Sequence, residues 1–147
     1  MATEKFQAYA NRGTVLTTEL NSLASNANTA AGPAYDNSSN RDRYAIAVLN
    51  LPSLVSAPAD GATLELFAVT APDGTTYVDG GGAVDPSGFT YLGSFVMRPV
   101  ATAQVQQSQR FELQPCLMKF VLRNTAGVAI AATLNTVTLF TTNRDIA

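Results

Sequence analysis

From residue 43 onward, apolar and polar residues alternate in short runs, which is the pattern of β-strands with one buried face. In the clearest run, Met118, Phe120 and Leu122 share one face, and charged side chains take the other. The final run places Val137 and Leu139 inward against a threonine-rich outer face. The alternation predicts strands at residues 44–51, 63–70, 91–98, 110–114, 117–124 and 135–142.

Glycine, proline, asparagine and aspartate separate these runs. Asp60-Gly61 and Pro72-Asp73-Gly74 are strong turn sequences, and prolines directly follow several of the strands. No long amphipathic helix lies between the strands, so parallel βαβ units are excluded. The sequence therefore predicts an all-β fold, with residues 41–147 forming an antiparallel β-sandwich, and a jelly roll is favoured over a closed barrel.

Residues 1–40 have a different composition, rich in alanine, asparagine, serine and threonine. Leu16, Leu20 and Leu23 are spaced by four and three positions, which places them on one helical face. A threonine at position 17 or 18 is a suitable N-cap for that helix. We expect this segment to be an N-terminal arm that contains at most one short helix.

Several large apolar residues fall at positions that the alternation predicts to be outward. If the leucines of residues 63–70 face the core, then Phe67 and Val69 lie on the opposite face. Phe140 is outward by the same argument, and the arm carries Phe6 and Tyr9. Single exposed aromatics are normal in proteins. Together with a low content of charge, however, these five residues predict contacts with other subunits.

The composition is that of a single domain with few charges. The chain has 147 residues, of which 46% are hydrophobic and only 14% charged, against about 25% charged in an ordinary soluble domain. Net charge is −2, and the longest cluster of cations is Arg41-Asp42-Arg43. A nucleic-acid-binding protein needs clustered cations, so that class is not expected. Nor does any run approach the length of a membrane span.

The residues available for catalysis are few. The chain has no histidine, which removes the commonest general base and the commonest metal ligand. Its one cysteine, Cys116, stands between Pro115 and Leu117, so we expect a partly buried structural thiol. The N-terminus lacks the apolar stretch of a secretory signal, which fits synthesis in a reducing cytoplasm. We expect no enzymatic activity.

The acidic residues allow two further kinds of site, and both are disfavoured. Most aspartates, Asp36, Asp42 and Asp73 among them, fall in predicted turns, where the side chain commonly binds nearby backbone amides. A glycosidase carboxylate pair is therefore improbable. Residues 79–85 place two aspartates around three glycines, but they lack the ligand spacing of a calcium loop. We interpret this segment as a connecting loop and expect no metal or cofactor.

The C-terminal third, with Lys119-Phe-Val-Leu-Arg-Asn124 and Asn135-Thr-Val-Thr-Leu139, resembles a segment of small virion proteins of tailed bacteriophages. Residues 118–143 contain Lys-Phe-Val-Leu-Arg-Asn followed by a glycine turn and then Asn-Thr-Val-Thr-Leu. The middle of the chain is similar as well, with Asp36-Asn37-Ser38, Gly-Ala-Thr-Leu-Glu-Leu-Phe and Asp73-Gly74-Thr-Thr-Tyr77. Together the similarity covers about residues 15–142. The proteins in question are capsid decoration, or cement, proteins.

This resemblance implies a jelly-roll fold, assembly as a homotrimer, and a place on the outer surface of the head between subunits of the major capsid protein. A carbohydrate-binding or tail- and receptor-associated β-sandwich module is the alternative; there, tyrosines such as Tyr77 and Tyr91 would stack on sugar rings. A small hydrolase is a remote third hypothesis, since it would have to work without histidine.

Overall fold

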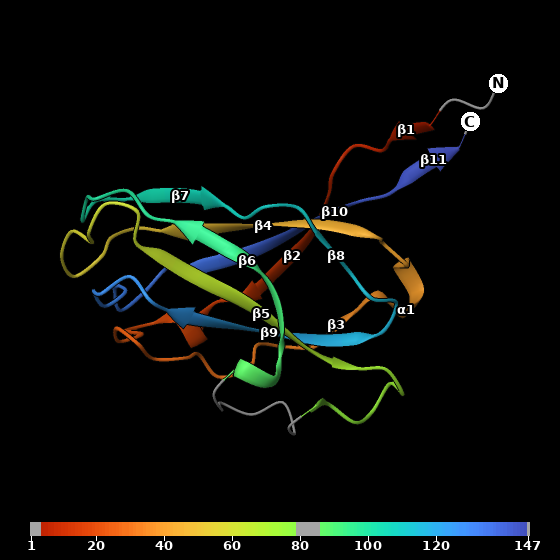
Figure 1. The fold of residues 1–147 in the computed structure, drawn as a ribbon, viewed down its shortest axis with the longest axis horizontal. Helices are drawn as coiled ribbons and strands as arrows, with labels where there is room; N and C mark the ends of the chain where they lie inside the picture. Colours follow the sequence, from red (N-terminus) through yellow and green to blue (C-terminus); the bar gives the residue numbers. More distant parts are fainter. Residues whose placement is uncertain (1–3, 79–85, 147) are drawn as a thin grey trace.

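The chain folds into two antiparallel β-sheets packed face to face, and both termini leave the sandwich at the same end (Figure 1). We describe this fold from a computed structural model, in which residues 4–78 and 86–146 are described. The predicted all-β antiparallel sandwich is confirmed.

The first sheet has the order β2-β10-β4-β7, and β8 also pairs with β4. Its strands are β2 (Ala10–Leu16), β10 (Thr136–Thr142), β4 (Tyr44–Leu51), β7 (Gln104–Gln107) and β8 (Phe111–Glu112). The second sheet has the order β3-β9-β5-β6. Its strands are β3 (Tyr35–Asp36), β9 (Leu117–Asn124), β5 (Thr63–Ala71) and β6 (Thr90–Val96). Single helical turns lie at η1 (Thr18–Leu20), α1 (Asn37–Asn40) and η3 (Pro86–Gly88).

The pairing of strands is that of a jelly roll. β2 pairs with β10, β3 with β9, β4 with β7, and β5 with β6, and all four pairs are antiparallel. Successive pairs alternate between the two sheets, so the chain behaves like one long hairpin rolled up over a common core. The predicted preference for a jelly roll over a closed barrel is therefore confirmed.

Each central strand follows the predicted alternation. In β4, Ala45, Ala47, Leu49 and Leu51 are fully buried between the sheets, whereas Ile46 is only half-buried. The opposing sheet contributes Phe95 and Phe120, both without exposure to solvent. These buried residues belong to one cluster, which combines small alanines from one sheet with large aromatics from the other.

The structure corrects the division into an arm of residues 1–40 and a sandwich of residues 41–147. β2 and β3 belong to the two sheets, and Leu16 and Leu20 are fully buried in their common core. Between them the backbone runs beside β9, where the Thr29 amide donates to the Leu122 carbonyl at 2.9 Å. Of the described residues before position 41, only strand β1 (Glu4–Phe6) lies in a sheet outside the sandwich, where it pairs with β11 (Arg144–Ile146).

The helix predicted from the leucine spacing shrinks to the single turn η1. The leucines are buried as that spacing suggested, but Leu23 is held by the loop after η1 rather than by a longer helix. Further along this loop, Gly32 allows the backbone to pass close to β2. A Cβ at this position would collide with the Val15 carbonyl oxygen. In the described part of the chain, no helix is long and apolar enough to cross a membrane.

Candidate interaction surface

The two ends of the chain form a separate two-stranded ribbon. β1 (Glu4–Phe6) pairs antiparallel with β11 (Arg144–Ile146), in the register Lys5 to Asp145 and Phe6 to Arg144. The pair is a sheet of its own and projects away from the sandwich (Figure 1). A two-stranded ribbon is marginally stable by itself in water. Its open edges also present backbone groups to any neighbouring protein.

The ribbon is attached to the sandwich at its base. The Gln7 amide donates to the Asn143 carbonyl at 3.0 Å, and the Thr142 hydroxyl donates to the Gln7 carbonyl at 2.6 Å. On either side of Gln7, Phe6 and Tyr9 are 58% and 46% exposed. These two residues of the predicted interface are therefore available to a partner; that they contact one stays a prediction.

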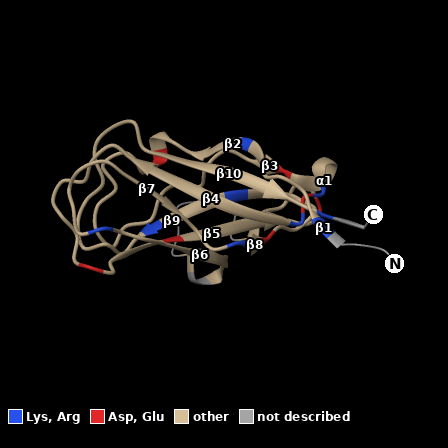
Figure 2. Cartoon of the chain, turned by 90° about the horizontal axis from the view of Figure 1, so that it is seen from above, with Lys and Arg blue, Asp and Glu red and all other residues tan. Residues whose placement is uncertain are grey.

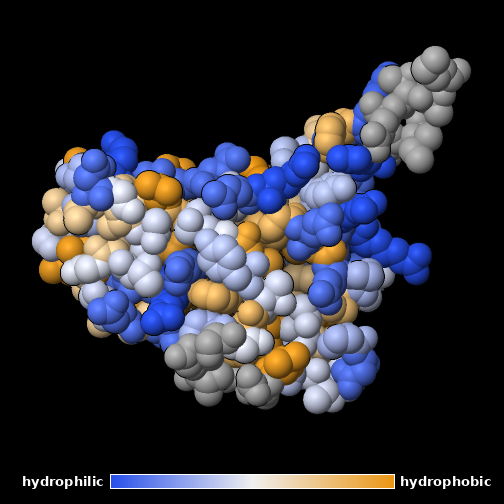
Figure 3. Space-filling model, in the orientation of Figure 1, coloured by the Kyte–Doolittle hydropathy of each residue, from blue (hydrophilic) through white to orange (hydrophobic). Residues whose placement is uncertain are grey.

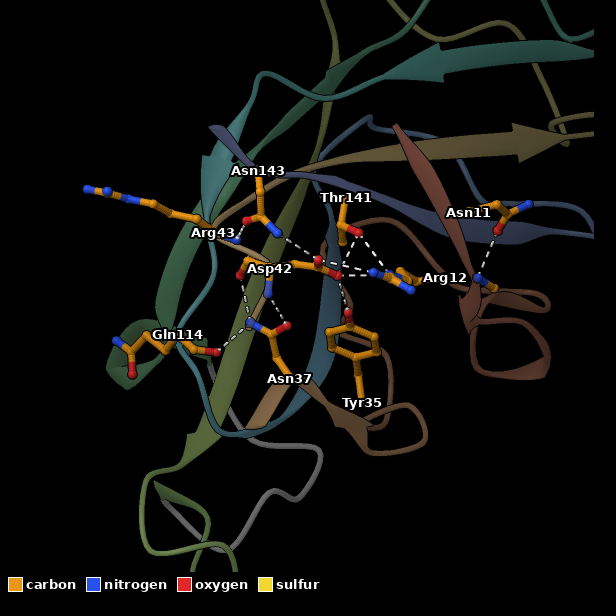
Figure 4. Close-up of polar contacts among 10 residues, drawn as sticks. Asn11, Arg12, Tyr35, Asn37, Asp42, Arg43, Gln114, Thr141 and Asn143 are labelled. Carbon is orange, nitrogen blue, oxygen red and sulfur yellow. Dashed lines mark hydrogen bonds and ion pairs between the residues drawn. The ribbon is translucent and has the colours of Figure 1, made fainter. Parts of the chain in front are cut away.

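A buried carboxylate, Asp42, holds the strands together below this base. Its side chain is 4% exposed and forms a bidentate ion pair with Arg12, with distances of 2.8 and 3.0 Å. The Thr141 hydroxyl donates to Asp42 at 2.7 Å, the Asn143 amide at 3.2 Å and the Tyr35 hydroxyl at 3.4 Å (Figure 4). The network thus connects β2, β3, β10 and the start of β4.

The backbone around Asp42 is fixed by Asn37 at the start of α1. The Asn37 amide group donates to the carbonyls of Asp42 and Gln114 at 2.8 and 2.9 Å, and its oxygen accepts from the Asp42 amide at 3.0 Å (Figure 4). Asn37 has no exposure to solvent, and both of its hydrogen bonds to the Asp42 backbone are buried. Buried polar groups of this kind are stable only when every member is paired.

Burial disfavours the charged form of Asp42, but the hydrogen bonds from Arg12 and Thr141 outweigh it, so the pKa of this carboxyl lies below its usual value. The same hydrogen bond raises the pKa of the Arg12 guanidinium. Donors from four residues occupy the carboxylate oxygens, which leaves little acceptor capacity for a substrate. We therefore interpret Asp42 as a structural clamp.

Three arginines gather around two aromatic rings beside this clamp; we call Arg43, Arg110 and Arg144, with Tyr44 and Phe6, the arginine cluster. Their guanidinium carbons lie 5.5, 4.8 and 5.6 Å from the centre of the Tyr44 ring. Arg110 and Arg144 also lie 5.3 and 5.2 Å from the centre of the Phe6 ring. The cluster therefore joins β4, the chain before β8 and the ribbon through cation–π contacts.

Charge is distributed unevenly over the molecule. Strands β4, β10 and β7 contain no charged residue. Charged residues gather near α1 and β1, at the end from which both termini leave (Figure 2), and the base of the ribbon is strongly hydrophilic on the face shown in Figure 3. Phe140 lies half-buried on the outer, uncharged face of β10, so the prediction of its outward position is confirmed.

The prediction that Phe67 and Val69 lie on an exposed interface is wrong. They are only 9% and 1% exposed, so the chain itself covers them. The Phe67 ring packs edge-on against Tyr91 at 5.6 Å, and Lys119, the neighbour of Val69 across the sheet, lies 4.5 Å from the centre of the Tyr77 ring. Residues after β5 thus fold back over this outer face, which the alternation alone does not reveal.

The remaining candidate chemistry of the sequence is accounted for individually. Cys116 is a buried free thiol whose pKa is raised by burial, as predicted for a structural cysteine. Among the described residues, no group of acidic or cysteine side chains could hold a metal ion. The glycine-rich segment 79–85 lies outside the described residues. A small cleft of about 30 Å³ lies between β5, β6 and β8, and it is lined by Ala68, Leu92 and Met118 among others.

Comparisons with known proteins do not assign this chain to a family. No protein-family model and no curated protein matches the sequence. Among solved structures, the chain is similar to an arabinose-bound GH51 α-L-arabinofuranosidase, with 9% identity, a TM-score of 0.35 and 96% of this chain covered. A second similarity is to the catalytic domain of a GH87 α-1,3-glucanase, with 14% identity, a TM-score of 0.27 and 95% coverage. The chain spans 23% and 28% of those two proteins.

The sequence analysis missed both the clamp and the arginine cluster. Asp42 was expected to bind nearby backbone in a turn, and Arg43 was noted only as part of a short mixed-charge stretch. Arg110 and Arg144 are far from Arg43 in the sequence, and only the jelly-roll pairing of β4 with β8 and β10 brings them together. No local pattern in the sequence signals such a cluster.

Proposed function

We propose that this protein is a non-enzymatic virion structural protein that decorates the outer surface of a tailed-phage head, binding between subunits of the major capsid protein. The observation that carries the proposal is the terminal ribbon. A marginally stable ribbon with an exposed phenylalanine and open edges is suited to pairing with another protein chain.

The rest of the molecule supports the same role. Jelly rolls serve widely as capsid domains. The uncharged outer face of β10, β4 and β7 lets a second protein surface approach without desolvating charges. Assembly as a homotrimer, which the sequence resemblance implies, would multiply modest contacts through effective concentration.

The test uses expanded phage heads that lack this protein. Purified protein should cosediment with the heads at saturable stoichiometry, and the bound heads should resist heat or chelator better than bare heads. Deletion of residues 1–6, which removes β1, should weaken binding at least about tenfold, equivalent to 1.4 kcal/mol. Tyr91→Ala, an exposed aromatic on the other sheet, is the matched control and should bind normally. Failure of the intact protein to bind any head would refute the proposal.

A further inference from the structure

Two members of the arginine cluster, Arg43 and Arg110, carry positive charge without a carboxylate partner among the described residues. Arg43 and Arg110 are exposed, and within residues 4–78 and 86–146 neither forms an ion pair with a carboxylate. Glu112 is the register partner of Tyr44, yet it is not paired with them either. Cations gathered around a single ring repel one another, and a bound anion would relieve that repulsion.

The cluster is also held in place before any partner arrives. The Arg43 amide donates to the Asn143 side-chain oxygen at 2.7 Å, and the Arg43 carbonyl accepts from the Leu113 amide at 2.9 Å. Asn143 in turn is bound to Asp42, so the clamp fixes the backbone from which the Arg43 side chain extends. In Figure 4 that side chain points away from the network.

The aromatic rings restrict the guanidinium groups further. Tyr44 is 7% exposed, and the guanidinium carbons of Arg43 and Arg110 lie 5.5 and 4.8 Å from the centre of its ring, so cation–π attraction holds both groups beside it. Arginine in a fixed orientation binds carboxylates through two parallel hydrogen bonds, which gives both strength and direction. Less side-chain entropy is then lost on binding than for free surface arginines.

We propose that the arginine cluster docks an acidic, carboxylate-bearing segment of the protein to which this chain binds. The inference rests on the proposed function, and it supplies the chemistry of one contact on the shell. A protein segment fits better than a nucleic acid. The chain carries a net charge of −2 and a pI of about 4.9, which repels a polyphosphate, and the cluster adjoins an uncharged sheet face suited to protein.

The first experiment measures binding to expanded heads that lack the protein. The double variant Arg43→Gln/Arg110→Gln should bind at least about tenfold more weakly than wild type. Its affinity should also depend less on salt, since fewer charges are screened. Arg110→Lys should bind heads with intermediate affinity, because lysine keeps the charge and loses the bidentate hydrogen bonding of the guanidinium group. Thermal unfolding of each variant confirms that it is folded.

Two control variants distinguish binding through the arginine cluster from a general effect of net charge. Arg98→Gln removes one positive charge outside the cluster, in the β6–β7 connection, and it should bind like wild type. Glu112→Gln removes the carboxylate beside the cluster and should strengthen binding. If wild type binds heads and the double variant binds equally well, the inference is wrong while the proposed function stands. If the wild-type protein binds no head, both the inference and the proposed function are wrong.

A second probe identifies the class of partner without heads. Deca-glutamate should shift the NMR side-chain signals of Arg43 and Arg110 saturably, and the double variant should show no such shift. Tighter binding of a ten-nucleotide single-stranded DNA at the same salt would contradict the inference in favour of nucleic acid. A change in oligomeric state of the double variant, with head binding intact, would contradict it in favour of a second copy of this chain.

Discussion

At the scale of single residues, the aspartates show what the sequence could and could not tell. Asp36 accepts from the Ser38 amide at 2.9 Å, and Asp73 from the Thr75 and Thr76 amides at 2.9 and 2.7 Å, as expected for turn aspartates. Asp42 instead binds Arg12 and Thr141. Backbone capping depends on neighbours in sequence, whereas the clamp depends on strands that meet only in the folded sheet.

Replacing Asp42 by asparagine should destabilise the protein by about 2 kcal/mol, because the buried side chain loses its charge-assisted hydrogen bonds, while Arg12, which is 30% exposed, stays in contact with water. Urea unfolding of the two proteins measures the difference. Asp60→Asn, in an exposed turn, is the control and should stay within about 0.5 kcal/mol of wild type. Equal stability of D42N and wild type would show that the clamp contributes nothing.

The same clamp predicts a dependence on pH. Because the pKa of Asp42 is lowered in the folded protein, its contribution is complete above the pKa of the unfolded chain, about 4. It is lost as pH falls through the lower folded value. Wild type should therefore lose stability below about pH 4, and its advantage over D42N should narrow there. A gap that stays constant from pH 7 to pH 2 would contradict this assignment.

At the scale of elements, alternation located the strands but not everything that covers them. The predicted runs at 44–51, 117–124 and 135–142 match β4, β9 and β10 within one residue at each end. The pattern did not predict β2, β3 or β7. Glycine, asparagine and threonine hide the alternation of β2, β3 is only two residues long, and β7 has one apolar residue among glutamines. A period of two identifies the opposite face of β5, but it does not show that the following loop returns to bury that face.

Burial distinguishes Phe67 from Phe140, although the alternation predicted both side chains to face outward. Phe67→Ala should cost about 3 kcal/mol of folding stability, because Phe67 is packed between its own sheet and Tyr91. Phe140→Ala, on the half-buried outer face of β10, should cost clearly less. Chemical denaturation of both variants tests the correction. A larger loss for Phe140 would restore the original assignment of Phe67 to an interface.

At the scale of the whole molecule, the sequence predicted the layers, and the structure added the order of strands. Antiparallel sandwich architecture follows from short alternating runs separated by turns, without intervening helices. The jelly-roll order does not follow from them, since it requires β2 to pair with β10 from opposite ends of the chain. That pairing also makes the N-terminal segment part of the core.

A chain of residues 41–147 alone is therefore expected not to fold. Without β2 and β3, β9 and β10 would each lose a neighbouring strand, and the core would lose Leu16 and Leu20. Its amide NMR signals should be poorly dispersed, and its thermal unfolding should be non-cooperative. Deletion of residues 1–6 should leave cooperative unfolding intact. A well-dispersed spectrum from residues 41–147 would support the original division into arm and sandwich.

Electron cryomicroscopy of particles assembled with this protein tests the proposed contact between the jelly roll and a capsid most directly. The account predicts sandwich density outside the head, between major capsid subunits. The ribbon should touch the shell, and the arginine cluster should face acidic side chains. Density in the tail or at a fibre tip, or a bound sugar at the tyrosines of the second sheet, would contradict it.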